Sequence, residues 1–220
     1  MEKVFAGKED VNMGRQENTK ELFLYEALKL FGERGYEAVK ISEIAEAVGC
    51  TAPALYKHYE SKQKLFEAII EESERGYANS MRAIRVDFSK DEEAKARFAN
   101  MTVEDQIQGI KKLFLHALHD PWASSFRKLA TVEQFRIRKL AQEYNDRYVT
   151  ALFEQYEKIF RYLMEIGKMK QGDAYTLAMA YISPITLMIG VCDREPDKED
   201  WALEMIEKSI RQFHESYRIE

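Results

Sequence analysis

The sequence has 220 residues, of which 45% are hydrophobic and 32% charged, enough apolar material for a sizeable core beneath a soluble surface. Only four prolines and ten glycines interrupt it, so the composition argues against a disordered chain, a β-sandwich or a barrel and indicates an all-helical protein. The net charge of −5 gives no general attraction to nucleic acid, so a DNA-binding site would have to be a local arrangement.

Cysteine content and hydropathy indicate a cytoplasmic protein without a membrane span. Cys50 and Cys192 lie far apart and neither belongs to a CxxC pattern, so we expect no disulfide framework and a reducing compartment. The first residues lack the basic, apolar and small-residue pattern of a signal segment, so we expect none. The most apolar run, residues 175–191, contains Ser183 and Pro184 and is short for a bilayer span. We therefore expect it to be a buried helix.

The beginning of the chain predicts a tail followed by a helix. Residues 1–15 are polar and lack periodicity, which is typical of a flexible N-terminal tail. Apolar residues at helical spacing then predict a helix that starts at Asn18 or Thr19. Gly35 is expected to close this helix in the left-handed conformation.

Two short helices and a longer one are predicted next. The first short helix has Ser42 as its expected N-cap and stops at Gly49. The second runs from about Ala52 to Tyr59, with Thr51 as its expected cap. A long amphipathic helix follows Ser61.

The rest of the chain predicts a larger helical body. The helical pattern weakens through residues 86–102 and then resumes. We expect a small N-terminal unit over 16–62 and a body over 63–220 in which helices occupy about 103–119, 122–140, 142–167, 173–192 and 198–217.

The two short helices, joined at Gly49 and braced by the preceding helix, fit the helix-turn-helix plan. The second helix of such a unit lies in the DNA major groove. Small side chains at Ala52, Pro53 and Ala54 would allow the backbone to approach the groove closely. Contacts of this kind suit a thymine methyl group better than a hydrogen-bonding base edge.

A cluster of cationic and aromatic side chains indicates contact with the DNA backbone. Lys62 lies in the first turn of the long helix, where a cation costs about 0.3–1 kcal/mol against the helix dipole. A phosphate bound at the same helix start would make the position of this cation favourable. The alternative is a solvated surface lysine, but the nearby Tyr56, Lys57 and His58 favour phosphate binding.

The stretch LFGERGYEAVKISEIAEAVGCTAPALYKHYESKQKLFEAI resembles the DNA-binding domain of the TetR family of bacterial transcriptional repressors, and the likeness covers residues 22–70. It implies an N-terminal three-helix DNA-binding domain and a C-terminal helical ligand-binding and dimerisation domain. Glu26 departs from the family pattern, where a small residue is common. The resemblance implies DNA-backbone contacts from Lys40, Ser42, Thr51, Tyr56, His58 and Lys62, and base contacts from Ala52, Pro53, Ala54 and Lys57.

The C-terminal helix carries a narrow apolar seam of the kind that packs against other helices. The seam could belong to the core of one chain, whereas the family resemblance implies a homodimer through the last two helices. A two-fold dimer would present two recognition helices to a near-palindromic DNA operator. The residues expected at this interface are Ile185, Met188, Trp201, Met205, Ile206, Ile210 and Phe213.

Aromatic residues between the DNA-binding unit and the seam have two interpretations. They could simply be core, or, as the resemblance implies, they could enclose a pocket for an unidentified small-molecule effector. The candidate pocket residues are Trp122, Phe126, Phe135, Tyr144, Tyr148, Phe153, Met179 and Tyr181, and Tyr156 belongs to the same aromatic set.

The expected function is therefore a TetR-like repressor, released from DNA by a small molecule and working without metal or cofactor. One alternative is a helical metal-dependent enzyme built on His116, His119 and Asp120, although no further ligand is evident in the sequence. The other is a helix-turn-helix interaction module without an effector.

Overall fold

The computed structural model describes residues 7–84 and 91–219, and the side chains of 19–78 and 91–219. Within these ranges the long regular elements are helices, which confirms the expected all-α class. They are α1 (Gly7–Arg34), α2 (Ile41–Ala47), α3 (Ala52–Tyr56), α4 (Lys62–Ile84), α5 (Glu92–Asn100), α6 (Val103–His119), α7 (Pro121–Glu133), α8 (Arg138–Asn145), a π-helical turn (Asp146–Thr150), α9 (Ala151–Glu165), α10 (Ala174–Arg194), a 3-10 turn (Pro196–Lys198) and α11 (Glu199–Tyr217).

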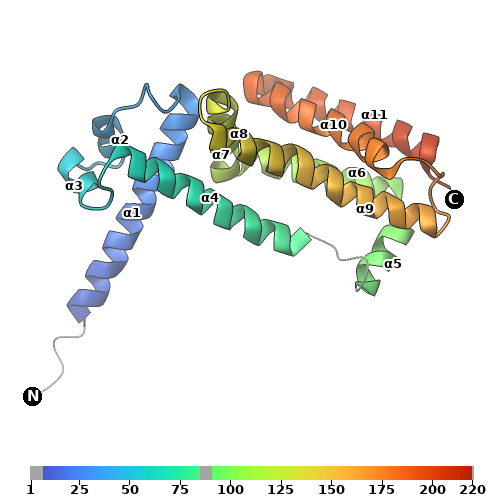
Figure 1. Cartoon of the computed structure of the whole chain (residues 1–220), viewed down its shortest axis with the longest axis horizontal. Coiled ribbons are helices and arrows are strands. Elements are labelled where there is room, and N and C mark those ends of the chain that lie inside the picture. The colour runs from blue at the N-terminus through green and yellow to red at the C-terminus, as the bar shows by residue number, and fades with distance from the viewer. Residues whose placement is uncertain (1–6, 85–90, 220) are drawn as a thin grey trace, which may run out of the picture.

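The helices form two groups that lie side by side (Figure 1). Helices α1–α3 and the start of α4 gather at one end, α9–α11 extend toward the other, and α4 runs from the first group along the second. Helices α7 and α8 lie where the groups meet. The start of α1 and the end of α11 are therefore at opposite ends of the described part of the molecule.

The first hydrophobic core joins the N-terminal helices to α7 and α8. Phe31, Ile44 and Leu55 pack in one cluster with Phe126 and Leu140. The expected boundary between two domains at residue 62 is therefore not a boundary in the packing, because the first core contains residues from both sides of it. Any displacement of α7 will act on the N-terminal unit because they share this core.

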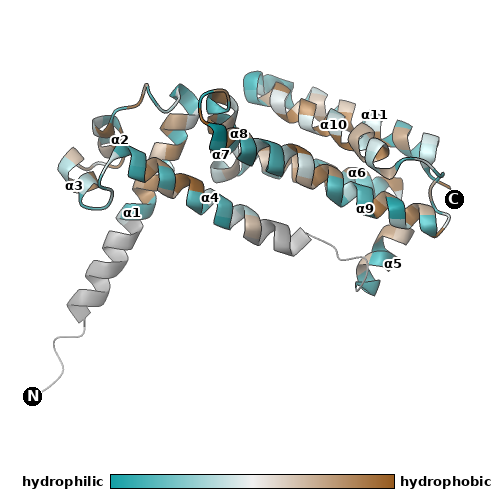
Figure 2. Cartoon of the chain, in the orientation of Figure 1, coloured by the Kyte–Doolittle hydropathy of each residue, from teal (hydrophilic) through white to brown (hydrophobic). Residues whose placement is uncertain are grey.

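The second core lies among α6, α9, α10 and α11. The rings of Phe160, Tyr181 and Phe213 meet in its centre, with centroids 4.9–5.5 Å apart. Helix α10 is long and apolar enough to cross a bilayer, but Leu177 and Ile182 on it are buried in this core. Figure 2 shows hydrophobic residues along the helices of this group.

The first helix is longer than the sequence predicts. It begins at Gly7 instead of Asn18 or Thr19, so residues 7–15 of the expected tail are helical, and residues 1–6 lie outside the described part. The prediction rested on apolar periodicity, which begins only where α1 meets the core. The expected closure of α1 at Gly35 is confirmed by its φ of 82°.

The helix predicted over 122–140 is two helices. Helix α7 ends at Glu133, whose carbonyl oxygen accepts the N–H groups of Arg136 and Ile137, and α8 starts after Ile137, whose backbone is extended. The helix predicted from 142 to 167 accordingly starts at Arg138 and passes through the π-helical turn. Such a turn adds a residue without ending the helix, so apolar spacing does not reveal it.

Candidate functional site

The turn between α2 and α3 is built around Gly49. Its φ of 71° is left-handed, and no heavy atom lies within 4 Å of the position a Cβ would take. The N–H of Gly49 donates to Glu46 and that of Cys50 to Ala45, at 2.9 and 2.8 Å, which closes α2. Because Leu55 is fully buried beneath α3, the opposite side of this helix faces outward.

Helix α2 starts two positions earlier than the sequence predicts. Lys40, not Ser42, is the N-cap, with extended backbone, and its N–H donates to the Glu43 carboxylate at 2.7 Å. This bond and the Arg34 guanidinium, 2.8 Å away, lower the pKa of Glu43. Lys40 and Ser42 themselves remain exposed.

Helix α3 places the expected base-reading residues along its outer side. Thr51 is the N-cap as predicted, and it makes no side-chain capping bond to α3, so its exposed hydroxyl remains available. Pro53 is exposed, while Ala52 and Ala54 are half-buried. Tyr56 is 50% exposed and ends the helix, three residues earlier than expected.

The residues after α3 differ in their surroundings. Lys57 is exposed, whereas His58 is half-buried and its ring lies 5.7 Å from that of Phe23. Ser61 caps α4 as predicted by accepting the Lys64 N–H.

Lys62 is held by the N-terminal unit. Its Nζ lies 4.3 Å from the ring centroid of Tyr36 and donates to the Glu37 carbonyl oxygen at 3.4 Å. A cation over an aromatic ring is stabilised by the ring quadrupole, which offsets its unfavourable place at the start of α4. The ammonium group therefore sits between α4 and the turn that follows α1.

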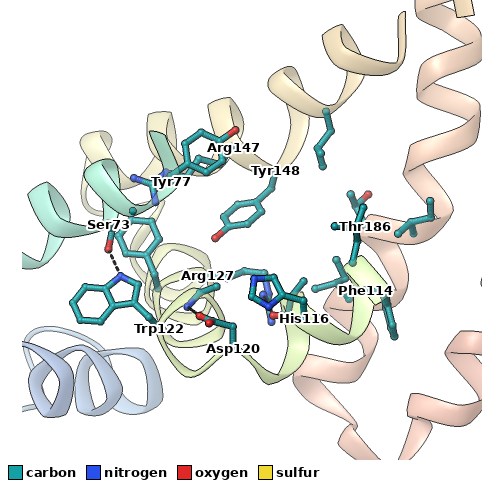
Figure 3. A pocket seen from close by; sticks show the side chains of 18 of the residues that line it. Ser73, Tyr77, Phe114, His116, Asp120, Trp122, Arg127, Arg147, Tyr148 and Thr186 are labelled. Carbon is teal, nitrogen blue, oxygen red and sulfur yellow. Dashed lines mark hydrogen bonds between the residues drawn. The ribbon is translucent and has the colours of Figure 1, made fainter. Parts of the chain in front are cut away.

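A cavity of about 800 Å³ lies beside the N-terminal unit (Figure 3), between side chains of α1, α4, α6, α7, α9, α10 and the π-helical turn. Its walls are mostly apolar. The aromatic residues that line it are Tyr25, Tyr77, Phe114, Trp122, Phe126, Tyr148 and Tyr156. Its ionisable residues are Glu21, Glu72, His116, Asp120, Arg127 and Arg147.

The expected pocket residues divide into two sets. Trp122, Phe126 and Tyr148 line the cavity, as does Tyr156. The others do not, because helical spacing does not tell which face of a helix turns inward. Tyr144 packs against the first core, Phe153 lies edge-on to Tyr175, Tyr181 is in the second core, Met179 is 42% exposed, and Phe135 is 91% exposed on the turn between α7 and α8.

Two buried arginines of the cavity were not expected from the sequence. Arg127 makes a bidentate ion pair with Asp193 at 2.7 and 2.8 Å and also donates to the Ala117 carbonyl oxygen at 2.6 Å. Arg147 pairs with Glu143, 2.6 Å away. The i,i+4 spacing of Glu143 and Arg147 is the one signal in the sequence for either pair.

Helices α4 and α7 meet through a hydrogen bond in the cavity wall. The Trp122 indole Nε1 donates to Ser73 Oγ at 3.0 Å, and Ser73 is only 2% exposed (Figure 3). On the cavity's other side, burial raises the pKa values of Tyr148 and Tyr156 to about 12. Both phenols therefore stay protonated at neutral pH.

The expected interface residues are only partly on the surface. Ile185, Ile206 and Ile210 are buried within the chain, and Phe213 stacks on Phe160, so these four belong to the core. The sequence left open whether the seam packs within the chain or against a partner, because spacing alone does not distinguish internal from external packing. Met188 and Met205 are half-buried, Trp201 is 44% exposed, and Leu187, which was not predicted, is 59% exposed.

The side chains of the alternative enzyme hypothesis have separate partners. His119 Nε2 lies 2.8 Å from the Glu199 carboxylate, and Asp120 caps α7 by accepting the Ala123 N–H at 2.7 Å. His116 lines the cavity. Among the described residues, no group of three or more His, Cys, Asp or Glu side chains is placed to hold a metal ion.

Comparisons with known proteins agree with this geometry. Residues 23–69 match the family described as bacterial regulatory proteins, tetR family. The HTH-type transcriptional repressor ComR of Escherichia coli (strain K12) is 42% identical over 48 residues, which span 22% of this chain but only 23% of ComR. The nucleoid occlusion factor SlmA of Klebsiella pneumoniae is 27% identical over 176 residues, 78% of this chain and 77% of SlmA. SmeT, the repressor of the Stenotrophomonas maltophilia multidrug efflux pump SmeDEF, shares the fold in its triclosan complex, with 18% identity, a TM-score of 0.61, and coverage of 92% of this chain and 93% of SmeT.

Proposed function

Since residues 23–69 are a DNA-binding domain of the TetR family and the chain has the fold of that family's regulators, we propose that it is a repressor. It binds a near-palindromic operator as a homodimer and leaves the DNA when a small molecule enters the cavity. It acts in the cytoplasm, without a cofactor and away from the membrane.

DNA binding rests on the outer side of α3 and the turns beside it. Pro53 and Tyr56 face outward above the buried Leu55, so they can enter a groove without disturbing the core. Lys40, Lys57 and Lys62 are the cations available for phosphates along this surface.

The observation that carries effector control is the position of the cavity. Helices α4 and α7 both line it, through Ser73 and Trp122 among others, and both also hold the N-terminal unit. A molecule that changes the distance between these helices must change how the N-terminal unit is held. Release follows if the molecule binds the displaced arrangement more tightly than the DNA-bound one.

The homodimer is supported by apolar side chains on the outer faces of α10 and α11. Leu187 and Trp201 are 59% and 44% exposed, and the half-buried Met188 and Met205 extend the apolar surface. A contact through these helices would be related by two-fold symmetry, which matches a palindromic operator. SmeT is described as a repressor and has been solved with triclosan, which agrees with a ligand-controlled repressor of this fold.

The two alternatives fit the geometry less well. The enzyme hypothesis needs His116, His119 and Asp120 to converge, but His119 pairs with Glu199 and Asp120 caps α7. The hypothesis of an interaction module without an effector leaves the large apolar cavity without a role.

Selection of bound fragments from genomic DNA with the purified protein tests the proposal. We expect fragments that share a near-palindromic motif, and Tyr56→Ala should weaken binding to them. Recovery of fragments without a common motif, or unchanged affinity in Tyr56→Ala, would refute the repressor function. Release is then tested by adding apolar molecules to the complex with the selected operator.

A further inference from the structure

We propose that the effector is an uncharged aromatic molecule with a hydrogen-bond acceptor oxygen, which it directs at the hydroxyl group of Tyr148. The inference rests on the proposed function in one respect, that the cavity is the effector site. It adds the chemical class of the ligand and the residue that selects it.

The hydroxyl group of Tyr148 is the starting point. Figure 3 shows it reaching into the space enclosed by the labelled side chains. Within residues 19–78 and 91–219, the Tyr148 hydroxyl makes no hydrogen bond to the protein. Burial raises the pKa of this phenol to about 12, so it remains a donor at neutral pH. Tyr148 is half-buried, and a donor that faces a cavity in this way can be satisfied by an acceptor brought in by a ligand.

The groups around Tyr148 also favour a ligand that carries a hydrogen-bond acceptor. The guanidinium charges of Arg127 and Arg147 are close enough to act on the Tyr148 phenol, lowering its pKa against the larger effect of burial. Guanidinium groups can donate but not accept hydrogen bonds. This part of the wall therefore offers donors to a ligand.

An anionic ligand is disfavoured because both arginine charges are already neutralised. Arg127 has Asp193 as a bidentate partner, and Arg147 has Glu143 at 2.6 Å. The carboxylates of Glu21, Glu72 and Asp120 also line the cavity. Glu72 pairs with Arg75 and Asp120 caps α7, so an anionic ligand would enter this low-dielectric space without a free partner for its charge in the described part of the wall.

A cationic ligand is disfavoured because a cation already occupies the aromatic faces near Tyr148. The Arg147 guanidinium lies 4.4 Å from the Phe126 ring centroid and 5.0 Å from that of Tyr77. A second cation stacked there would face Arg147. What remains is an uncharged ligand whose rings pack on the apolar wall and whose acceptor oxygen meets Tyr148.

Four naphthalene derivatives of nearly equal size provide the test, with isothermal titration calorimetry of the full-length protein. Acetylnaphthalene is uncharged and carries an acceptor, ethylnaphthalene lacks the acceptor, naphthoate is an anion, and naphthyl trimethylammonium is a cation. We expect acetylnaphthalene to bind about fivefold more tightly than ethylnaphthalene, as one net hydrogen bond predicts, and more tightly than both ions.

The variant Tyr148→Phe should remove the preference for acetylnaphthalene over ethylnaphthalene and leave the affinity for ethylnaphthalene unchanged. The matched control is Tyr175→Phe, a tyrosine of α10 that is 39% exposed and does not line the cavity. It should keep the preference.

Tighter binding of either ion, or a preference that survives in Tyr148→Phe, overturns the inference but leaves effector control standing. Absence of binding by all four probes overturns the inference together with the cavity as an effector site. Binding as expected with no effect on operator affinity supports the inference and refutes release, so the two failures are distinguishable.

Discussion

Glu133 Oε1 accepts a hydrogen bond from the Tyr36 N–H at 2.8 Å, and this contact joins the last turn of α7 to the turn between α1 and α2. Glu133 is 1% exposed, so the bond is shielded from water. The Tyr36 ring in turn lies against the ammonium group of Lys62. One short chain of contacts therefore runs from α7, which lines the cavity, to a cation expected to touch DNA.

Close packing of α1 on α7 supports this connection. A Cβ on Gly32 would lie 2.7 Å from the Ser125 carbonyl oxygen, so the two helices approach at a glycine. A Cβ on Gly35 would lie 2.8 Å from Glu133 Oε1. Helix α1 and the residue that follows it thus both contact α7, and α1 should follow a movement of α7 because a packed core has little room to deform.

The variant Glu133→Ala should destabilise the protein. It leaves the Tyr36 N–H without its acceptor and opens a cavity, and we expect the free energy of unfolding to fall by about 1–3 kcal/mol. Glu133→Gln keeps an acceptor oxygen and should lose less. Urea denaturation followed by circular dichroism measures both, and equal losses in the two variants would contradict a role for the hydrogen bond.

The variant Ser73→Ala removes the acceptor of the Trp122 indole at the junction of α4 and α7. We expect the free energy of unfolding to fall by about 1 kcal/mol, since the indole N–H is left facing the cavity. Fluorescence in a Trp201→Phe background, where Trp122 is the remaining tryptophan, should report the altered surroundings. Ser124→Ala is the control, and an unchanged Trp122 emission in Ser73→Ala would contradict the assignment.

The sequence predicted the N-terminal unit better than the body. Gly35, Gly49 and Ser61 are local signals whose effect depends on their own backbone, and each acts as expected. The division of apolar residues in the body between cavity, core and surface depends on how helices are rotated against one another. Spacing within one helix carries no information about that rotation, so it could neither place Phe135 on the surface nor decide between core and interface for Ile206.

Buried charges show the same limit. Arg127 and Asp193 are 66 residues apart, and no local pattern links them. Their bidentate pair depends on the packing of α7 beside α10, which the sequence does not reveal. The donor-rich wall on which ligand selection depends could therefore not be predicted from the sequence, although Tyr148 itself was named as a candidate.

The variant Lys62→Ala should weaken operator binding at all sequences alike. If Lys62 neutralises one phosphate, the slope of log affinity against log salt concentration should fall in magnitude by about 1. Fluorescence anisotropy over a series of salt concentrations measures this slope. Lys208→Ala, an exposed lysine of α11 paired with Glu204, is the control and should keep the wild-type slope.

The variants Leu187→Asp and Trp201→Asp should separate the homodimer into folded monomers. Each places a charge on the apolar outer face of α10 or α11. Dimer formation would bury this charge without a partner, at a cost on the order of several kcal/mol. Both side chains are exposed in the single chain, so the helical circular dichroism signal should remain. Light scattering after size-exclusion chromatography gives the mass.

Phe135→Asp is the control. It changes an apolar residue that is 91% exposed on the turn between α7 and α8, and it should leave the dimer intact. A monomeric wild-type protein, or a dimer that persists in both interface variants, would refute association through these two helices.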